Sequence, residues 1–407
     1  MAEAPAQQTT QPATLPVTGT LSAAEIGNGV WWRPELDETS ITLMLDNLAR
    51  WNIQNVYVDV FRSGETLFPS RVFPQKEGAA RKRDWLGEIT MQAHSRGIRV
   101  HAWVQTLCVV DPEDGQSSGP HETVLDHPDW LDLPANGQPL SGISAARYLS
   151  PANAEVVSSL TSLTAELCQM PLDGINLDAL CYNPLMDMGY GKAAVAEFRA
   201  KTGIDPTQIE PDMARDSDWM AWTLFREDKL TSLVQSIAGE CRRQGAEQGR
   251  RIILSAIVQP GYEQGRGADF AYQHWSQWVD NDLLDATTPG CFHGDLPGLE
   301  KQLWEIRSIQ MNSDMPCLPG LALDHVSRSR SVSPYSVAGA TRSANMHPTL
   351  ADQKRLLRNT GFRYYNVMDY RGLVEEMQTP RPQEKNHKRG FWDWIRGSEA
   401  AHEEPSQ

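Results

Sequence analysis

Short runs of apolar and β-branched residues recur along this chain, and each run is followed by a segment in which apolar residues take helical spacing. Runs of the first kind predict buried strands. The chain contains eight of them: Gly29–Trp32, Asn55–Phe61, Ile98–Gln105, Leu172–Asp178, Arg251–Val258, Leu284–Thr288, Cys317–Leu323 and Arg363–Met368.

The segments between these runs predict amphipathic helices, and several carry stop signals. Gly97 follows His94-Ser95-Arg96, and Gly361 follows Arg358-Asn359-Thr360. The expected helices are Thr39–Trp51, Asp84–Arg96, Ala154–Gln169, Trp219–Gln244, Tyr272–Asp280, Gly298–Gln310 and Thr349–Thr360.

This alternation of strands and helices predicts the fold class. Strand–helix–strand units pair their strands in parallel through right-handed crossovers, and eight units close a (β/α)8 TIM barrel. A doubly wound open sheet is the alternative fold, but neither GxGxxG nor GxxxxGK[ST] follows any predicted strand. We therefore expect an α/β protein with a closed barrel.

The domain organisation follows from where the periodic pattern begins and ends. Residues 1–24 predict a disordered N-terminal linker, residues 25–378 the barrel, and residues 379–407 a polar, mobile C-terminal tail around Phe391–Ile395. The segments after the third and fourth strands predict long loops, each with its helix included. Both leave strands at their carboxyl ends, where barrel enzymes carry their sites.

Charge and hydropathy exclude several classes of function. The formal net charge of -15 leaves no broad basic surface, which disfavours nucleic acid as a partner. No apolar run approaches the roughly 18 residues of a membrane-spanning helix. Met1–Thr20 lacks the apolar core of an export signal, although a polar opening also resembles the linker behind a removed signal.

The six cysteines are scattered, without CxxC spacing or a Cys/His cluster. They define neither a zinc site nor a disulfide framework, so we expect buried thiols. They are Cys108, Cys168, Cys181, Cys241, Cys291 and Cys317.

Asp178 is the first candidate for chemistry, because DGINLDALCYN predicts a buried strand that ends on this carboxylate. The other strand ends bring further polar and aromatic residues to the same face. They include Asp59, Arg62, Trp103, Tyr182, Asp324, Asp369 and Tyr370. Paired acids beside aromatic rings are typical of glycoside hydrolysis, in which one carboxyl donates a proton and another attacks or activates water.

Two alternatives stay open for these residues. Strand-end carboxylates also cap helices or form ion pairs, and Asp59 beside Arg62 has the spacing of a pair. A metal-dependent hydrolase is the second alternative, with His101, His293 or His325 near the mouth, but no HxH or HExxH spacing supports it. A serine nucleophile is disfavoured because no predicted strand leads through a GxSxG elbow into a helix.

Several blocks in order resemble the glycoside-hydrolase-like family 10 barrels of bacteria. GVWWRP resembles the first strand of the family, NVYVDVFRSGETLFPS its second-strand block, and GIRVHAWV its H-A-W strand. HPDWLDL, RYLSPANAEV and DGINLDALCYN resemble the H-P-E-W loop, the L-N-P segment and the D-G-I-x-x-D-D strand. Trp222 and Arg226, after Met188-Gly189-Tyr190, resemble a helix with a W-R-R-D motif.

The resemblance implies that Asp178 is the acid of the fourth strand, with Arg62, His101, Trp103 and Asp173 also matching. Three positions depart from the family pattern. Ala179 replaces the second acid of the D-D pair, Glu65-Thr66 replaces Asp-Ala, and Asp59 replaces a Gln. Glu263, in QPGYE after the fifth strand, is the candidate for the missing acid/base.

These observations predict a glycosidase that acts on a polysaccharide or peptidoglycan-like glycan without a cofactor. Asp178 would be the nucleophile or base and Glu263 the general acid, and the family implies an exported protein. Sugar contacts are expected from Arg62, Asp59, His101, Trp103, Tyr182, Asp324, Asp369 and Tyr370. A non-catalytic glycan-binding barrel is the alternative function, because Ala179 removes one carboxylate.

Overall fold

The structure is a computed structural model of the chain. It describes residues 12, 14–34, 40–77, 84–110, 126–140, 146–184, 186–210, 217–260, 271–292, 295–310, 314–323 and 348–378. The candidates Glu263, His293, Asp324 and His325, and the segment 379–407, lie outside these residues.

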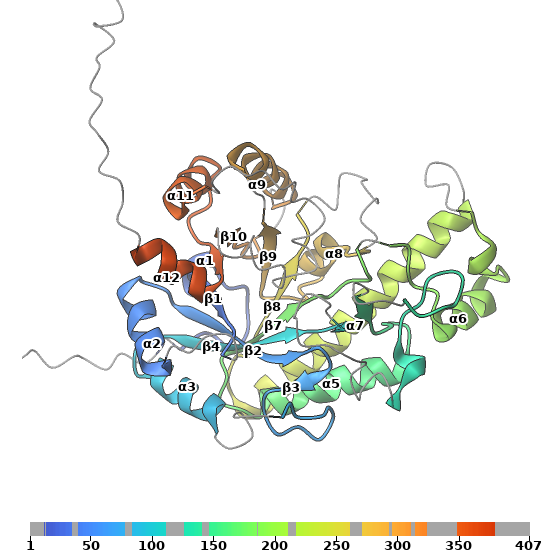
Figure 1. The fold of residues 1–407 in the computed structure, drawn as a ribbon, viewed down its shortest axis with the longest axis horizontal. Helices are drawn as coiled ribbons and strands as arrows, with labels where there is room; N and C mark the ends of the chain where they lie inside the picture. Colours follow the sequence, from blue (N-terminus) through green and yellow to red (C-terminus); the bar gives the residue numbers. More distant parts are fainter. Residues whose placement is uncertain are drawn as a thin grey trace, which may run out of the picture.

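Eight parallel strands form a closed barrel, which confirms the predicted (β/α)8 fold (Figure 1). Around the barrel they are β1 (Gly29–Trp32), β2 (Asn55–Arg62), β4 (Arg99–Gln105), β7 (Gly174–Asp178), β8 (Ile253–Val258), β9 (Ala286–Cys291), β10 (Gly320–Ala322) and β11 (Asn366–Met368). The sheet closes because β1 pairs with both β2 and β11. All eight predicted strands overlap these segments.

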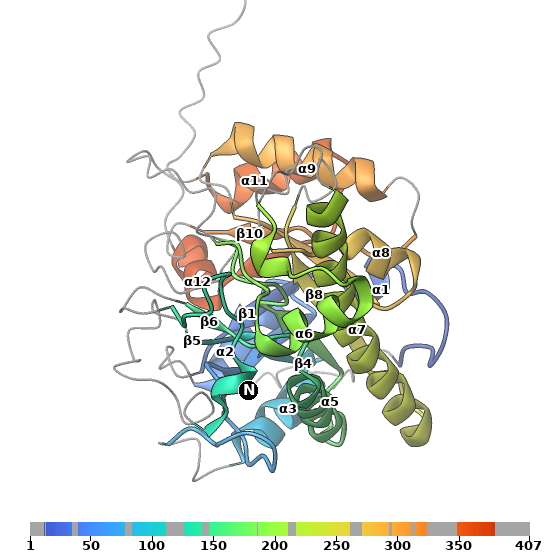
Figure 2. The same cartoon turned by 90° about the vertical axis from the view of Figure 1, so that its right-hand side faces the viewer.

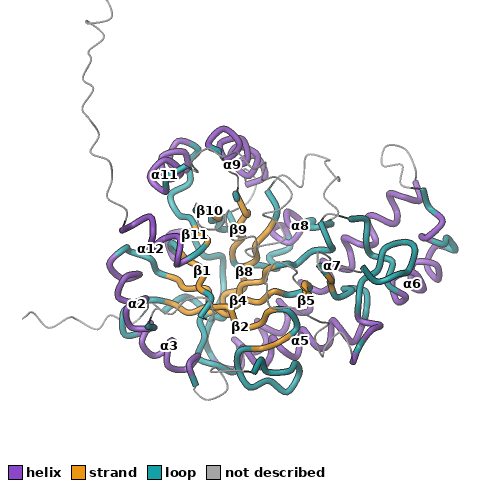
Figure 3. The backbone as a smooth tube through the Cα atoms, in the orientation of Figure 1, coloured by secondary structure: helices purple, strands orange, loops and turns teal. Residues whose placement is uncertain are grey.

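Helices surround the strands: Figure 3 shows the purple helices outside the orange strands. They are α2 (Ile41–Arg50), α3 (Trp85–His94), α5 (Ala154–Cys168), α7 (Ser217–Gln248), α8 (Trp275–Asp280), α9 (Leu296–Gln310), α11 (Leu350–Asn359) and α12 (Tyr370–Gln378). Side-chain caps set several starts: Ser40, Asn153 and Thr349 each accept a hydrogen bond from a first-turn amide. No helix within the described ranges has the length and apolar character needed to cross a membrane.

Part of the segment predicted as a linker packs against the barrel. A short helix, α1 (Ala23–Ile26), begins with a capping box formed by Ser22 and Glu25. Leu21 is almost fully buried and packs in a cluster with Ile253 and Leu318, near the amino-terminal ends of the strands.

Additional elements follow β4 and β7 in the chain. After β4, β5 (Cys108–Val110) and β6 (Arg147–Tyr148) pair in antiparallel fashion, and the short 3-10 helix η3 (Pro128–Trp130) lies between them in sequence. After β7 come α6 (Lys192–Thr202) and η4 (Pro206–Gln208). Figures 1 and 2 show α6 and the start of α7 beside the barrel. β5, β6, η3, α6 and η4 were not predicted, whereas α7 contains the predicted helix Trp219–Gln244.

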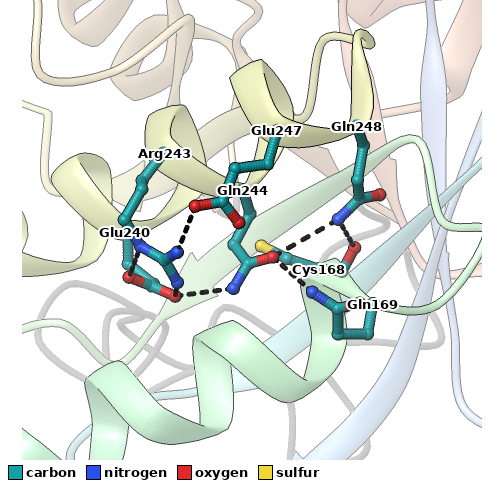
Figure 4. A network of polar contacts seen from close by, with 7 residues as sticks. All are labelled: Cys168, Gln169, Glu240, Arg243, Gln244, Glu247 and Gln248. Carbon is teal, nitrogen blue, oxygen red and sulfur yellow. Dashed lines mark hydrogen bonds and ion pairs between the residues drawn. The ribbon is translucent and has the colours of Figure 1, made fainter.

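The remainder of α7 packs along α5, and polar side chains join the two helices (Figure 4). The Gln169 amide donates to Gln244 Oε1, and the Gln244 amide donates to Glu240 at 2.9 Å. Gln248 donates to the carbonyl oxygen of Cys168 at 3.0 Å. The end of α5 is therefore bonded to one face of α7.

Candidate functional site

Asp178 is the last residue of β7, opposite Gln105 of β4, and its side chain is 1% exposed. Oδ2 accepts a hydrogen bond from the Trp103 indole at 3.0 Å, and Oδ1 accepts one from the Ala179 amide at 2.7 Å. Ala179 has a left-handed backbone, with φ of 47°. The residue that replaces the second family acid therefore contributes its amide to Asp178.

The pKa of Asp178 is raised to about 6, because burial disfavours the carboxylate. The Arg62 cation and the donors Ala179 and Trp103 oppose this rise, while the Asp59 carboxylate adds to it. A carboxyl group that changes charge near neutral pH is suited to acid/base work.

Arg62 connects Asp178 to a chain of buried charges. Its Nε donates to Asp59 Oδ2 at 2.5 Å, and Arg33 Nε lies 3.2 Å from the same oxygen. The Arg62 guanidinium stands 4.7 Å from the centroid of the Trp103 ring, whose indole holds Asp178. The structure thus brings Asp59, Arg62, Trp103 and Asp178 together, and confirms the ion pair between Asp59 and Arg62.

His101 lies on the same strand as Trp103, two residues closer to the amino-terminal end of β4. Its Nε2 bonds Asn55 Oδ1 at 3.0 Å, and its ring lies against Tyr57. Burial lowers the pKa of His101 to about 4, which keeps the imidazole neutral. Within the described residues, no three His, Cys, Asp or Glu side chains are grouped to hold a metal ion.

Asp369 and Tyr370, directly after β11, form hydrogen bonds with residues of the helix layer. Asp369 Oδ1 accepts a hydrogen bond from the Gly372 amide at 3.0 Å, at the start of α12. The Tyr370 hydroxyl accepts one from Asn47 of α2, also at 3.0 Å. Tyr370 is therefore directed at the helix layer.

Tyr182 belongs to a second buried cluster, centred on Arg226 of α7. The Tyr182 hydroxyl lies 3.4 Å from the Arg226 carbonyl oxygen, and its ring meets Tyr272 edge-on. Arg226 is 0% exposed, pairs with Asp187 at 2.5 Å, and lies 4.0 Å from the Tyr272 ring centroid and 4.9 Å from that of Trp219. The Trp222 and Arg226 spacing was the sequence signal for this cluster.

Asp132 is an acid that the sequence analysis did not single out. Burial raises its pKa to about 8, against the opposing effects of nearby Arg226 and the amides of Leu133, Gly189 and Gly191. It therefore retains its proton at neutral pH. The position of Asp132 in HPDWLDL was the sequence signal for this residue. Its burial, however, depends on how the loops fold over it.

Comparisons with known proteins identify the family and the fold. Residues 23–321 match a family model described as "Glycosyl hydrolase-like 10". Glycosyl hydrolase DigH of Escherichia coli strain K12 is 27% identical over 282 residues, which cover 63% of this chain and 58% of that protein. The chain thus spans less than two thirds of the length of the curated relatives it matches.

Solved structures share the fold. The β-galactosidase from the psychrophilic Marinomonas ef1 superposes with a TM-score of 0.58 at 14% identity, covering 84% of this chain and 53% of that one. The alpha-L-fucosidase isoenzyme 2 from Paenibacillus thiaminolyticus gives 0.50 at 13% identity, covering 89% and 45%. At such identities the likeness concerns the barrel alone.

Proposed function

This chain belongs to the glycosyl hydrolase-like 10 family, and on that premise we propose that it hydrolyses a glycosidic bond with Asp178 as nucleophile or base. One observation carries the proposal. A buried carboxyl group with a pKa of about 6 lies at the carboxyl end of a barrel strand, where barrel enzymes carry their sites. Asp178 can therefore be ionised at neutral pH and still bind a proton during turnover.

The reaction needs a second carboxyl group. The bond between the anomeric carbon and the leaving oxygen breaks, and that oxygen takes a proton from an acid. Water then supplies the hydroxyl group of the sugar and the proton that restores the acid. We assign the acid to Glu263, which follows the fifth strand in sequence. A carboxyl separation of about 5 Å would give retention, and one of about 6.5–9.5 Å inversion.

Trp103 orients Asp178 in this scheme. Its indole donates to Oδ2, and its ring is wholly buried beneath the Arg62 guanidinium. A ring in that place fixes the orientation of the carboxyl group, and its hydrogen bond favours the charged form against the effect of burial.

We propose a polysaccharide or peptidoglycan-like glycan as the substrate. A formal net charge of -15 disfavours nucleic acid as the partner, whereas a glycan can be held by local contacts. Such a glycan lies outside the cytoplasm, so we also propose an exported protein. Fractionation of cells that express the native gene tests this: recovery in the cytoplasm alone would contradict it.

The test is reducing-end release from peptidoglycan strands and a panel of neutral polysaccharides. Asp178→Asn and Glu263→Gln should each lower the rate about 100-fold or more. Asp46→Asn is the matched control, because its carboxylate is 49% exposed and pairs with Arg96 on the surface. Full activity in Asp178→Asn would refute the proposal, and full activity in Glu263→Gln alone would transfer the acid role to another residue.

A glycan-binding barrel without hydrolysis is the second candidate function. Ala179 stands where the family pattern has an acid, and its amide occupies Asp178 Oδ1. Calorimetric binding of a glycan, without release of reducing ends by the wild type, would favour this function.

A further inference from the structure

We propose that Asp59 acts through Arg62 as a positioning residue for Asp178: its carboxylate holds the Arg62 guanidinium over Trp103 and offsets that positive charge beside Asp178. The inference rests on the proposed function, since it concerns the same carboxyl group. It differs from the sequence expectation, in which Asp59 was a sugar contact.

The geometry of β2 places both residues of the pair. The pairing of β2 with β4 shifts register between Asp59 and Phe61, and Asp59 lies opposite Trp103. Such an irregularity redirects the side chains that follow it. Asp59 and Arg62 thereby meet at 2.5 Å, with Arg62 4.7 Å from the Trp103 centroid.

Arg33 also contacts the Asp59 carboxylate. Its Nε lies 3.2 Å from Asp59 Oδ2, the same oxygen that accepts from Arg62. Both guanidinium groups and the carboxylate are at most about a tenth exposed. Charges so far from water interact strongly, and each one changes the field at its neighbours.

Among the described residues, the two charged side chains that shift the pKa of Asp178 both lie on β2. Arg62 lowers the pKa of Asp178, and Asp59 raises it. Of the two strands beside β7, β8 has no titratable residue, and β4 places the neutral donor Trp103 beside Asp178. The titratable residues of β4, Arg99 and His101, lie toward its amino-terminal end. Removal of the Asp59 charge should therefore lower the pKa of Asp178, and removal of the Arg62 charge should raise it.

The experiment follows the titration of Asp178 in the full chain, without any glycan. Aspartate labelled with carbon-13 at Cγ reports each carboxyl group by NMR, and Asp178→Asn identifies its signal. We expect Arg62→Gln to move the Asp178 midpoint up by about one pH unit or more, and Asp59→Asn to move it down by a smaller amount, because Arg62 has the larger effect on the pKa of Asp178. Asp46→Asn, which removes a surface partner of Arg96, should leave it in place.

Shifts of opposite sign in Asp59→Asn and Arg62→Gln distinguish this positioning role from a purely structural one. Variants that only loosened the fold would shift the midpoint in one direction, toward that of an exposed aspartate. Midpoints unchanged in both variants, or shifted down in both, would overturn the proposal. A sugar contact would instead raise KM for glycan without moving the ligand-free midpoint.

The outcomes also separate this inference from the proposed function. Shifts of the Asp178 midpoint in opposite directions, without glycan release by the wild type or by any variant, would support the role of Asp59 and refute hydrolysis. Glycan release with an unmoved Asp178 midpoint in Asp59→Asn would support hydrolysis and refute the role of Asp59.

Discussion

Asp178 combines burial with two hydrogen bonds that favour its charged form. The Ala179 amide and the Trp103 indole together lower its pKa less than burial raises it. The carboxylate is thus held at a cost in stability, as is common where a group serves chemistry rather than folding. Its residue type and strand-end position could be predicted from DGINLDALCYN, but its proton affinity could not.

This cost predicts how stability depends on pH. An unfolded aspartate has a pKa of about 3.9, below the value of about 6 in the fold, so the folded state binds the proton more tightly. The stabilisation is complete below about pH 4 and is lost as pH rises through about 6. Relative to wild type, Asp178→Asn should therefore gain about 2–3 kcal/mol in unfolding free energy between pH 4 and pH 7.5.

Urea unfolding at a series of pH values measures this gain. The exposed control Asp46→Asn should show none. A difference between Asp178→Asn and wild type that stayed constant with pH would contradict the prediction, because it would report only the lost hydrogen bond.

At the scale of elements, the conformation of the loop after β7 depends on a close approach between its backbone and a side chain of α7. Gly189 has a φ of +109°, and a Cβ there would lie 2.4 Å from Arg226 Cδ. The loop also carries Asp187, the ion-pair partner of Arg226. The glycine is visible in the sequence, but its contact depends on where α7 passes.

Gly189→Ala should therefore destabilise the protein by more than backbone strain alone. Gly203→Ala is the matched control, since Gly203 also has positive φ (+76°) but a Cβ there would meet no atom within 4 Å. We expect a loss of about 1 kcal/mol at Gly203 and about 2–4 kcal/mol at Gly189. Equal losses of unfolding free energy in the two variants, measured by denaturant unfolding, would show that the Arg226 side chain moves aside without destabilising the protein.

The α5–α7 junction in Figure 4 gives a second prediction for elements. Gln244 is buried and bonds Gln169, Glu240 and Gln248, so Gln244→Ala leaves polar partners unsatisfied. The expected loss in unfolding free energy is about 1–3 kcal/mol. The exposed Gln138→Ala should change stability by less than about 0.5 kcal/mol. A loss in Gln244→Ala as small as that of the control would contradict the role of the junction.

At the scale of the whole molecule, packing covers all six cysteines, which are free and buried. Burial raises the pKa of Cys317 to about 12 and that of Cys291 well above its ordinary value. The neighbouring Cys168 thiol, together with burial, raises the pKa of Cys241. These thiols therefore form little thiolate, the reactive species, at neutral pH.

Thiol titration with a chromogenic disulfide reagent checks this arrangement. The folded protein should react slowly at all six positions, and the protein in guanidinium should release six equivalents at once. A rapid equivalent in the folded state would show that a cysteine is exposed. Four equivalents after unfolding without reductant would reveal a disulfide, for which Cys168 with Cys241, and Cys291 with Cys317, are neighbouring pairs.

The sequence by itself determined the order of strands and helices, and hence the barrel. Those features are local, because the spacing of apolar residues and the helix caps depend on a few consecutive residues. Eight alternating strand–helix units then favour a closed barrel. The observed ends of the short elements differ from the predicted ones. The predicted strand Leu284–Thr288, for example, corresponds to β9, which spans Ala286–Cys291. Strand ends depend on pairing with neighbours that lie far away in sequence.

Only the tertiary structure decided which strand-end residues meet. Asp178 ends β7 and Tyr370 follows β11, yet Asp178 bonds Trp103 and Tyr370 bonds Asn47 of α2. Arg33, Asp59 and Arg62 form a chain because β1 and β2 are neighbours. Charge interactions and exclusion of water act through space between distant segments, so the pKa of Asp178 and the role of Asp59 follow from the closed barrel rather than from local sequence.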